Sequence, residues 1–218
     1  MTWTILFKRF VEPRFLWNSG SSDTEPAAAG QAATADHAIS VSTPAPELNL
    51  GLDPLAFARE AFGFEPFPKQ AEVLNPTARR GILLCSRQWG KSTVLGARAA
   101  HMAITKPGSL TLIVAPIGPQ ANETLVKAVR FIEKVGIRTR KVAGYVHSAQ
   151  LPNGSRILAR AGQPQHIRGI SAVDLLILDE AAFLHNDVYP AVLPMISTTK
   201  GELWLASTPH GRRGFFYK

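Results

Sequence analysis

The segment Cys85–Thr93 carries the residue types of a phosphate-binding loop. It follows an apolar run at residues 81–84 that predicts a short strand, and it precedes residues 94–100, which predict a helix. In such a setting, backbone N–H groups and the positive end of the helix dipole converge on an anion. We therefore predict a nucleotide-binding loop formed by Ser86, Arg87, Gln88, Trp89, Gly90, Lys91, Ser92 and Thr93.

Two residues of this loop have defined roles in phosphate chemistry. Lys91 would contact the β- and γ-phosphates of a nucleotide, and the hydroxyl of Ser92 would ligate Mg²⁺. The usual loop pattern has a glycine where this chain has Cys85. Taken alone, the segment is therefore equally compatible with an ordinary strand, turn and helix.

A second signal is the pair Asp179-Glu180, which ends the apolar run Leu175–Leu178. An acid at the tip of a buried strand supports Mg²⁺ beside the loop serine, and the next carboxylate orients or deprotonates an attacking water. We predict Asp179 and Ser92 as the metal-supporting residues and Glu180 as the catalytic carboxylate. The alternative is that both acids cap a helix starting at Ala181. The two signals support each other because one magnesium nucleotide needs both.

Five further residues are considered on weaker signals. The guanidinium of Arg87 would neutralise charge that develops in phosphoryl transfer, unless it is a solvated loop arginine. Gln70 is a candidate adenine reader, unless it is an ordinary helix-surface glutamine. Ser207-Thr208 would sense the γ-phosphate and relay hydrolysis to a moving surface, although Ser-Thr-Pro is also an ordinary turn. For Arg168, a surface role is favoured over a contact with phosphate or a neighbouring subunit.

The elements that must position these residues alternate between strand and helix. Strands are expected at residues 81–84, 110–115, 173–178 and 202–206, and helices at residues 54–62, 67–74, 92–105 and 121–135. Asn153-Gly154 predicts a hairpin between residues 145–151 and 155–159, and two prolines predict an irregular helix over residues 188–196. This alternation predicts an α/β fold with a mostly parallel central sheet, whose ligands lie at the carboxyl ends of the strands.

Composition divides the chain into two parts. Residues 1–50 are expected to be a poorly ordered or linker-like segment, because residues 18–50 are rich in Ser, Ala, Thr, Gly and Pro and residues 1–17 lack the pattern of a signal peptide. Residues 51–218 are expected to form one domain. No apolar stretch approaches the ~18 residues of a membrane span, so no membrane is expected as a partner. The single cysteine excludes an intramolecular disulfide and suits a reducing cytoplasm.

The net charge of +8 is unevenly distributed. Residues 1–50 carry three Lys or Arg and five Asp or Glu, a net charge of −2, so the remainder carries +10. A basic globular part favours a polyanionic partner such as nucleic acid, although charge alone is equally compatible with a solvated surface. None of the six histidines has a second histidine or a cysteine at metal-ligand spacing.

Together these residues resemble the ATPase domain of tailed-phage terminase large subunits, the motors that drive DNA into capsids. The loop of that family is similar to Ser86–Ser92 and lacks the first glycine, which accounts for Cys85. Further similar segments follow in the family's order over residues 52–218: Phe67-Pro68-Lys69-Gln70, Val114-Ala115-Pro116 with Gln120, Pro152-Asn153-Gly154-Ser155, Ile167-Arg168-Gly169, Leu178-Asp179-Glu180-Ala181-Ala182, Ala206-Ser207-Thr208-Pro209, Gly211 and Phe215-Phe216-Tyr217.

The resemblance implies a P-loop NTPase of the RecA/ASCE-like type that hydrolyses ATP with Mg²⁺ to translocate double-stranded DNA. It implies catalytic roles for Glu180, Lys91 and Arg87, the last as an arginine supplied in cis, and a coupling role for Ser207-Thr208. The expected partners are double-stranded DNA, a homo-oligomeric ring, a portal protein and a small terminase subunit, in the cytoplasm of a bacterial host.

The family continues into a C-terminal nuclease domain, to which no residue of this sequence is assigned. The chain is thus expected to be an excised domain, one part of a split gene or a prophage remnant, with no nuclease activity. Two rival functions remain at this point. One is a helicase-type ATPase, which would need a second motor domain. The other is an inactive remnant that binds nucleotide or DNA without turnover.

Overall fold

The computed structural model describes residues 4–7, 51–75 and 77–218, and its centre is a seven-stranded sheet in the order β1-β2-β7-β6-β3-β5-β4. Six strands run parallel to their neighbours, and only the pair β4–β5 is antiparallel. The expected mostly parallel sheet is confirmed. The strands are β1 (Thr4–Phe7), β2 (Arg80–Leu84), β3 (Leu110–Ala115), β4 (Ser148–Gln150), β5 (Arg156–Ala161), β6 (Leu175–Asp179) and β7 (Glu202–Ser207).

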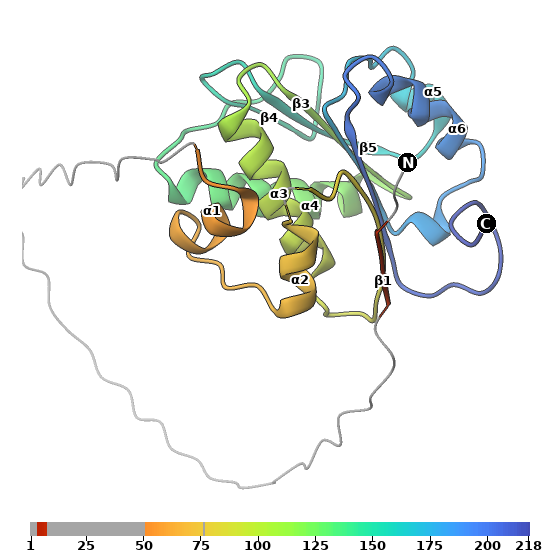
Figure 1. Cartoon of the computed structure of the whole chain (residues 1–218). Helices are drawn as coiled ribbons and strands as arrows, with labels where there is room; N and C mark the ends of the chain where they lie inside the picture. The colour runs from red at the N-terminus through yellow and green to blue at the C-terminus, as the bar shows by residue number, and fades with distance from the viewer. Residues whose placement is uncertain (1–3, 8–50, 76) are drawn as a thin grey trace, which may run out of the picture. The chain divides into compact units, whose positions relative to one another are not determined.

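Helices cover both faces of the sheet, as Figure 1 shows for α3 and α4 on one side and α5 and α6 on the other. The first helix begins as predicted, because the carboxylate of Asp53 accepts hydrogen bonds from the backbone N–H groups of Leu55 and Ala56. The helices are α1 (Pro54–Glu60), α2 (Pro68–Val73), α3 (Lys91–Thr105), α4 (Gly118–Lys134), α5 (Pro164–Ile167) and α6 (Val188–Val192), with 3₁₀ turns at Ala181–Phe183 and Leu193–Ile196.

Two apolar cores lie on the two faces of the sheet. One is built under α1 to α4 around Trp204, Phe57 and Ile113, and the other under α5 and α6 around Leu176 and Leu205. Every residue of β3 and β6 is buried, which explains why these strands read as continuous apolar runs rather than alternating ones. Within the described part of the chain, no helix is long and apolar enough to span a bilayer.

The hairpin and the proline-containing helix form as predicted. β4 and β5 pair antiparallel on either side of Asn153-Gly154, and Gly154 has a φ of +85° that favours glycine. The segment with Pro190 and Pro194 divides into α6 and a 3₁₀ turn, because a proline in a helix interior removes a backbone donor.

The strand β1 differs from the expectation that residues 1–50 lack regular structure. Thr4–Phe7 pairs in parallel with β2, in the register Thr4 to Gly81 and Phe7 to Leu84. β2 otherwise has a free edge, and its backbone N–H and C=O groups favour an added strand. Residues 1–3 and 8–50 lie outside the described residues, so the rest of that prediction stays a prediction.

The topology brings the polar ends of the central strands to one edge of the sheet. β7 lies between β2 and β6, so Ser207 pairs with Leu84 on one side while Ala206 pairs with Asp179 on the other. On the next strand, Val114 of β3 pairs with Leu178 of β6. The carboxyl ends of these strands therefore form one continuous row, where ligands of parallel α/β sheets bind.

Candidate nucleotide-binding site

The loop after β2 turns sharply into α3 at Gly90. Gly90 has a φ of +89°, which an L side chain rarely adopts, and a Cβ there would lie 2.7 Å from the side-chain nitrogen of Gln70. α3 begins at Lys91, and the N–H groups of its first turn point toward the loop, where a phosphate would lie. Ser86, Arg87 and Gln88 are exposed, Trp89 and Ser92 are half-buried, and Thr93 joins the first turn by donating its N–H to the carbonyl of Gly90.

Gln70, the candidate adenine reader, is buried behind the loop rather than exposed on a helix surface. Its Nε2 donates to the carbonyl of Trp89 at 2.8 Å, and its Oε1 accepts from the N–H of Phe67 at 3.0 Å. These two bonds join the start of α2 to the phosphate-binding loop. Phe67 is 71% exposed, so a large apolar surface lies beside this glutamine. Contact with adenine stays a prediction.

Asp179 lies at the tip of β6, buried among hydrogen-bond donors. Its Oδ2 accepts from the hydroxyl of Thr124 at 2.7 Å and from that of Ser92 at 3.4 Å, and its Oδ1 accepts from the N–H of Glu180 at 3.0 Å. Burial raises the pKa of Asp179 above its ordinary value, and the neighbouring Glu180 raises it further, while the bond from Thr124 lowers it. This buried carboxylate beside the loop serine is thus an arrangement that a cation would stabilise.

Glu180 has its backbone in the left-handed region, with a φ of +49°. Non-glycine residues rarely adopt this conformation, and when they do they concentrate at functional sites. Its Oε1 lies 3.6 Å from the Nζ of Lys91, a buried ammonium. Its Oε2 accepts from the hydroxyl of Ser207 at 3.3 Å and from the N–H and hydroxyl of Thr208 at 3.2 Å each. One carboxylate therefore contacts both the phosphate-binding loop and the end of β7.

The structure brings together most of the residues predicted from the sequence. Direct contacts join Lys91, Ser92, Asp179, Glu180 and the pair Ser207-Thr208. Two other candidates stand apart from these contacts. Arg87 is exposed at the top of the loop, and Arg168 is exposed at the end of α5. Their roles stay predictions.

Thr124 is a site residue that the sequence analysis missed. It lies on the buried face of α4, with Ala121, Leu125 and Ala128, and its exposed fraction is zero. The one available signal was a hydroxyl on an otherwise apolar helix face. A threonine at such a position usually bonds to its own helix or fills a core space, so only the fold shows that its partner is Asp179.

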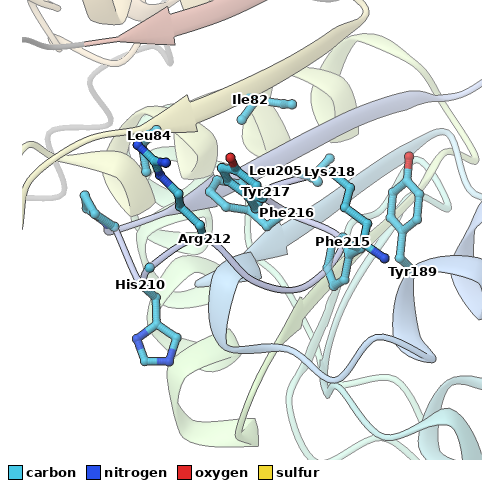
Figure 2. A pocket seen from close by; sticks show the side chains of 12 residues that line it. Ile82, Leu84, Tyr189, Leu205, His210, Arg212, Phe215, Phe216, Tyr217 and Lys218 are labelled. Carbon is cyan, nitrogen blue, oxygen red and sulfur yellow. The ribbon is translucent and has the colours of Figure 1, made fainter.

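A separate apolar cavity of about 850 Å³ begins just after Thr208, on the face of the sheet opposite α3. Figure 2 shows Ile82, Leu84 and Leu205 on one side of it and the chain's last aromatic residues on the other. Phe215 stacks on Tyr189 at 4.9 Å between ring centroids. The segment after β7 therefore packs back onto the sheet.

The sheet is mostly parallel, a loop with the sequence of a phosphate-binding loop leads into α3, and β7 lies between β2 and the Asp-Glu end of β6. These features define an α/β fold of the P-loop NTPase type. Comparison with known proteins identifies the family. The family model described as "Terminase large subunit, T4likevirus-type, N-terminal" matches residues 82–218. The chain belongs to this terminase large subunit family.

Individual relatives agree with this assignment. The large terminase subunit of Thermus phage G20c is 28% identical over 177 residues, which are 72% of this chain and 36% of the relative. The chain thus spans about a third of the length of that relative. The large terminase ATPase domain of Thermus phage P74-26 is 27% identical, with a TM-score of 0.67 over 76% of this chain and 73% of that one. The HK97 bacteriophage large terminase, at 17% identity, shares the fold, with a TM-score of 0.60 over 72% of this chain and 37% of that one.

Proposed function

We propose that this domain hydrolyses ATP with Mg²⁺ and uses the energy to translocate double-stranded DNA in viral packaging. The observation that carries the proposal is the position of Glu180, whose two carboxylate oxygens contact Lys91 on one side and Ser207-Thr208 on the other. A carboxylate next to the loop lysine is suited to orient an attacking water, and this one is also hydrogen-bonded to the end of β7.

The residues around Asp179 fit a magnesium ion. Mg²⁺ prefers oxygen ligands and usually binds proteins through one or two carboxylates, completing its shell with substrate phosphates and water. Asp179 and the hydroxyl of Ser92 offer such oxygens 3.4 Å apart. Asp179, buried with a raised pKa, is a carboxylate that a cation would favour in its ionised form. When bound, Mg²⁺ would neutralise charge on the β- and γ-phosphates.

The protein's own groups divide the remaining work. The N–H groups at the start of α3 and the ammonium of Lys91 would hold the phosphates. Glu180 would orient the attacking water and accept its proton, while Arg87 would neutralise charge on the transferred phosphoryl group. Ser207-Thr208 would change partners when Glu180 does, which links hydrolysis to β7 and the segment after it.

The proposed partners follow from family membership and charge. Residues 51–218 carry the whole positive excess of the chain, which suits DNA. We further propose that the protein assembles into a ring of identical subunits in the cytoplasm of a bacterial host. Its other partners would be a portal protein and a small terminase subunit.

Steady-state ATP hydrolysis by residues 1–218, with and without duplex DNA, tests the proposal. Two variants act as controls on the site. Lys91→Ala should lose both nucleotide binding and turnover. Glu180→Gln should keep ATP binding and lower kcat by at least about a hundredfold, because the general base is gone while the binding groups remain.

The outcomes separate the rival functions. Magnesium-dependent turnover that both variants remove, and that duplex DNA stimulates, would support the proposal. Stimulation by short single strands with unwinding would favour a helicase instead. Binding of ATP without turnover in the parent, with and without DNA, would refute an active motor in this chain and favour an inactive remnant.

A further inference from the structure

The densest run of basic residues in the sequence covers the C-terminal half of α4 and the segment that follows it, and it includes none of the candidate nucleotide-site residues. Residues 127–141 contain six basic residues and one acidic residue, Glu133, so this stretch alone supplies most of the net charge of +8. The basic residues are Lys127, Arg130, Lys134, Arg138, Arg140 and Lys141.

Part of this charge lines a groove at the β4 edge of the sheet. The groove has a volume of about 320 Å³ and lies between α4 and residues 139–148. Arg130 lines it from α4, and Arg140 and Lys141 line it from the facing segment, so both sides of the groove are basic. The rest of the lining is polar, aliphatic or acidic: Asn122, Thr139, Ser148, Leu125, Val126, Val129 and Glu133.

The guanidinium groups of this groove are available to a ligand. Arg130 and Arg140 are exposed, and neither forms an ion pair within the described residues. By contrast, the exposed Arg59 pairs with Glu65, and the buried Arg98 pairs with Glu202. Like charges facing each other across a groove repel, and an anion between them removes that repulsion. Guanidinium groups also match phosphate oxygens in geometry.

We infer that this groove, which we call the α4 groove and define by Arg130, Arg140 and Lys141, binds the phosphate backbone of duplex DNA. The inference rests on the proposed function and adds the surface on which the DNA would lie. Phosphate contacts of this kind supply sequence-independent affinity, which a motor that moves along any sequence requires.

The same helix connects the α4 groove to the nucleotide site. Thr124 lies on α4 before Arg130, and its hydroxyl donates a hydrogen bond to the carboxylate of Asp179 at 2.7 Å. A force that DNA exerts on Arg130 would therefore act on an element that is bonded to the carboxylate supporting the metal. This connection gives a route by which bound DNA would change the rate of hydrolysis.

The experiment measures duplex DNA binding of residues 1–218 over a range of salt concentrations, in the parent and in Arg130→Gln/Arg140→Gln. We expect the double variant to bind at least about tenfold more weakly near 0.1 M salt. We also expect its plot of log affinity against log salt to be shallower by about 1.8, since each lost phosphate contact removes about 0.9 from the slope. The control Arg59→Gln/Lys200→Asn removes two exposed positive charges elsewhere and should keep the parent's slope.

The results distinguish this inference from the proposed function. Equal slopes and affinities in the parent and Arg130→Gln/Arg140→Gln would overturn the inference, as would an equal loss in the control variant, which would mean that only total charge matters. ATP hydrolysis without DNA should be the same in all three proteins. A parent protein that hydrolyses no ATP either with or without duplex DNA would refute the proposed function, while the binding slopes would still report on the α4 groove.

Discussion

Replacing Thr124 by valine tests the idea that α4 holds Asp179, the carboxylate proposed to support the metal. Valine has nearly the same shape as threonine, so the change removes the hydroxyl and leaves the packing of Ala121 and Leu125 in place. The lost bond is 2.7 Å long and joins two buried groups. A hydrogen bond to a charged group contributes about 1.5–3 kcal/mol, so the free energy of unfolding should fall by about that amount. For a domain of this size, Tm should fall by roughly 3–12 °C.

The assay is urea unfolding at pH 7.5 without metal, in a double-mutant cycle with Asp179→Asn. The neutral amide oxygen of asparagine accepts a weaker hydrogen bond than a carboxylate does, so Thr124→Val should cost less in the Asp179→Asn background. Thr111→Val is the matched control. The hydroxyl of Thr111 is buried and finds no hydrogen-bond partner within the described residues, so its removal should leave stability unchanged or raise it.

Two results would refute the reasoning. An equal loss from Thr124→Val in both backgrounds would mean that the hydroxyl does not act through Asp179. An equal loss from Thr111→Val would mean that the effect comes from valine in the core rather than from the missing bond. The sign of the pH effect gives a further check. Because the pKa of Asp179 is raised, its contribution to stability falls as pH rises through that pKa, and Asp179→Asn should remove this decline.

Two further predictions concern other residues. Arg87→Ala should lower kcat by about a hundredfold or more with little change in the Kd for ATP, and an unchanged kcat would remove Arg87 from catalysis. Burial lowers the pKa of His101, which packs edge-on against Phe57, so folding favours the neutral form of this histidine. Stability should therefore fall as pH drops below the ordinary histidine value of about 6.5, and unfolding curves of His101→Gln should lack this decline; the same decline in both proteins would show that another group causes it.

The sequence predicted the parts of the site that short segments encode. The Gly-Lys-Ser turn needs a glycine at a φ of +89°, and the Asp-Glu pair follows a run of residues buried on both sides, so both leave local patterns. Their meeting at one edge of the sheet followed from the general rule for parallel sheets. The hydrogen-bond partners of Gln70 and Thr124 could not be predicted. The bond of Gln70 joins residues 19 positions apart, the bond of Thr124 joins residues 55 positions apart, and both depend on how helices pack.

The strand β1 was missed for a related reason. Four residues with the sequence Thr-Ile-Leu-Phe have no period that identifies a strand, and basic residues follow them. Their pairing with β2 depends on an open sheet edge whose paired residues lie 77 positions away along the chain. Strand formation here is a property of the assembled sheet rather than of the segment, and a reading of local patterns does not detect it.

The geometry of Glu180 gives a physical reason for the order of events in the proposed cycle. Its Oε1 faces Lys91, the residue that a nucleotide's phosphates would also attract, while its Oε2 accepts three hydrogen bonds from Ser207 and Thr208. In the proposed cycle, phosphates that draw Lys91 toward themselves would weaken its attraction for Oε1, which would free Glu180 to turn toward a water. When Glu180 turns, the donors of Ser207 and Thr208 would lose Oε2 as their acceptor and would have to form other hydrogen bonds. A site built in this way would couple nucleotide binding to the strand end through one carboxylate. The left-handed backbone of Glu180, with a φ of +49°, is a conformation that non-glycine residues adopt mostly at functional sites.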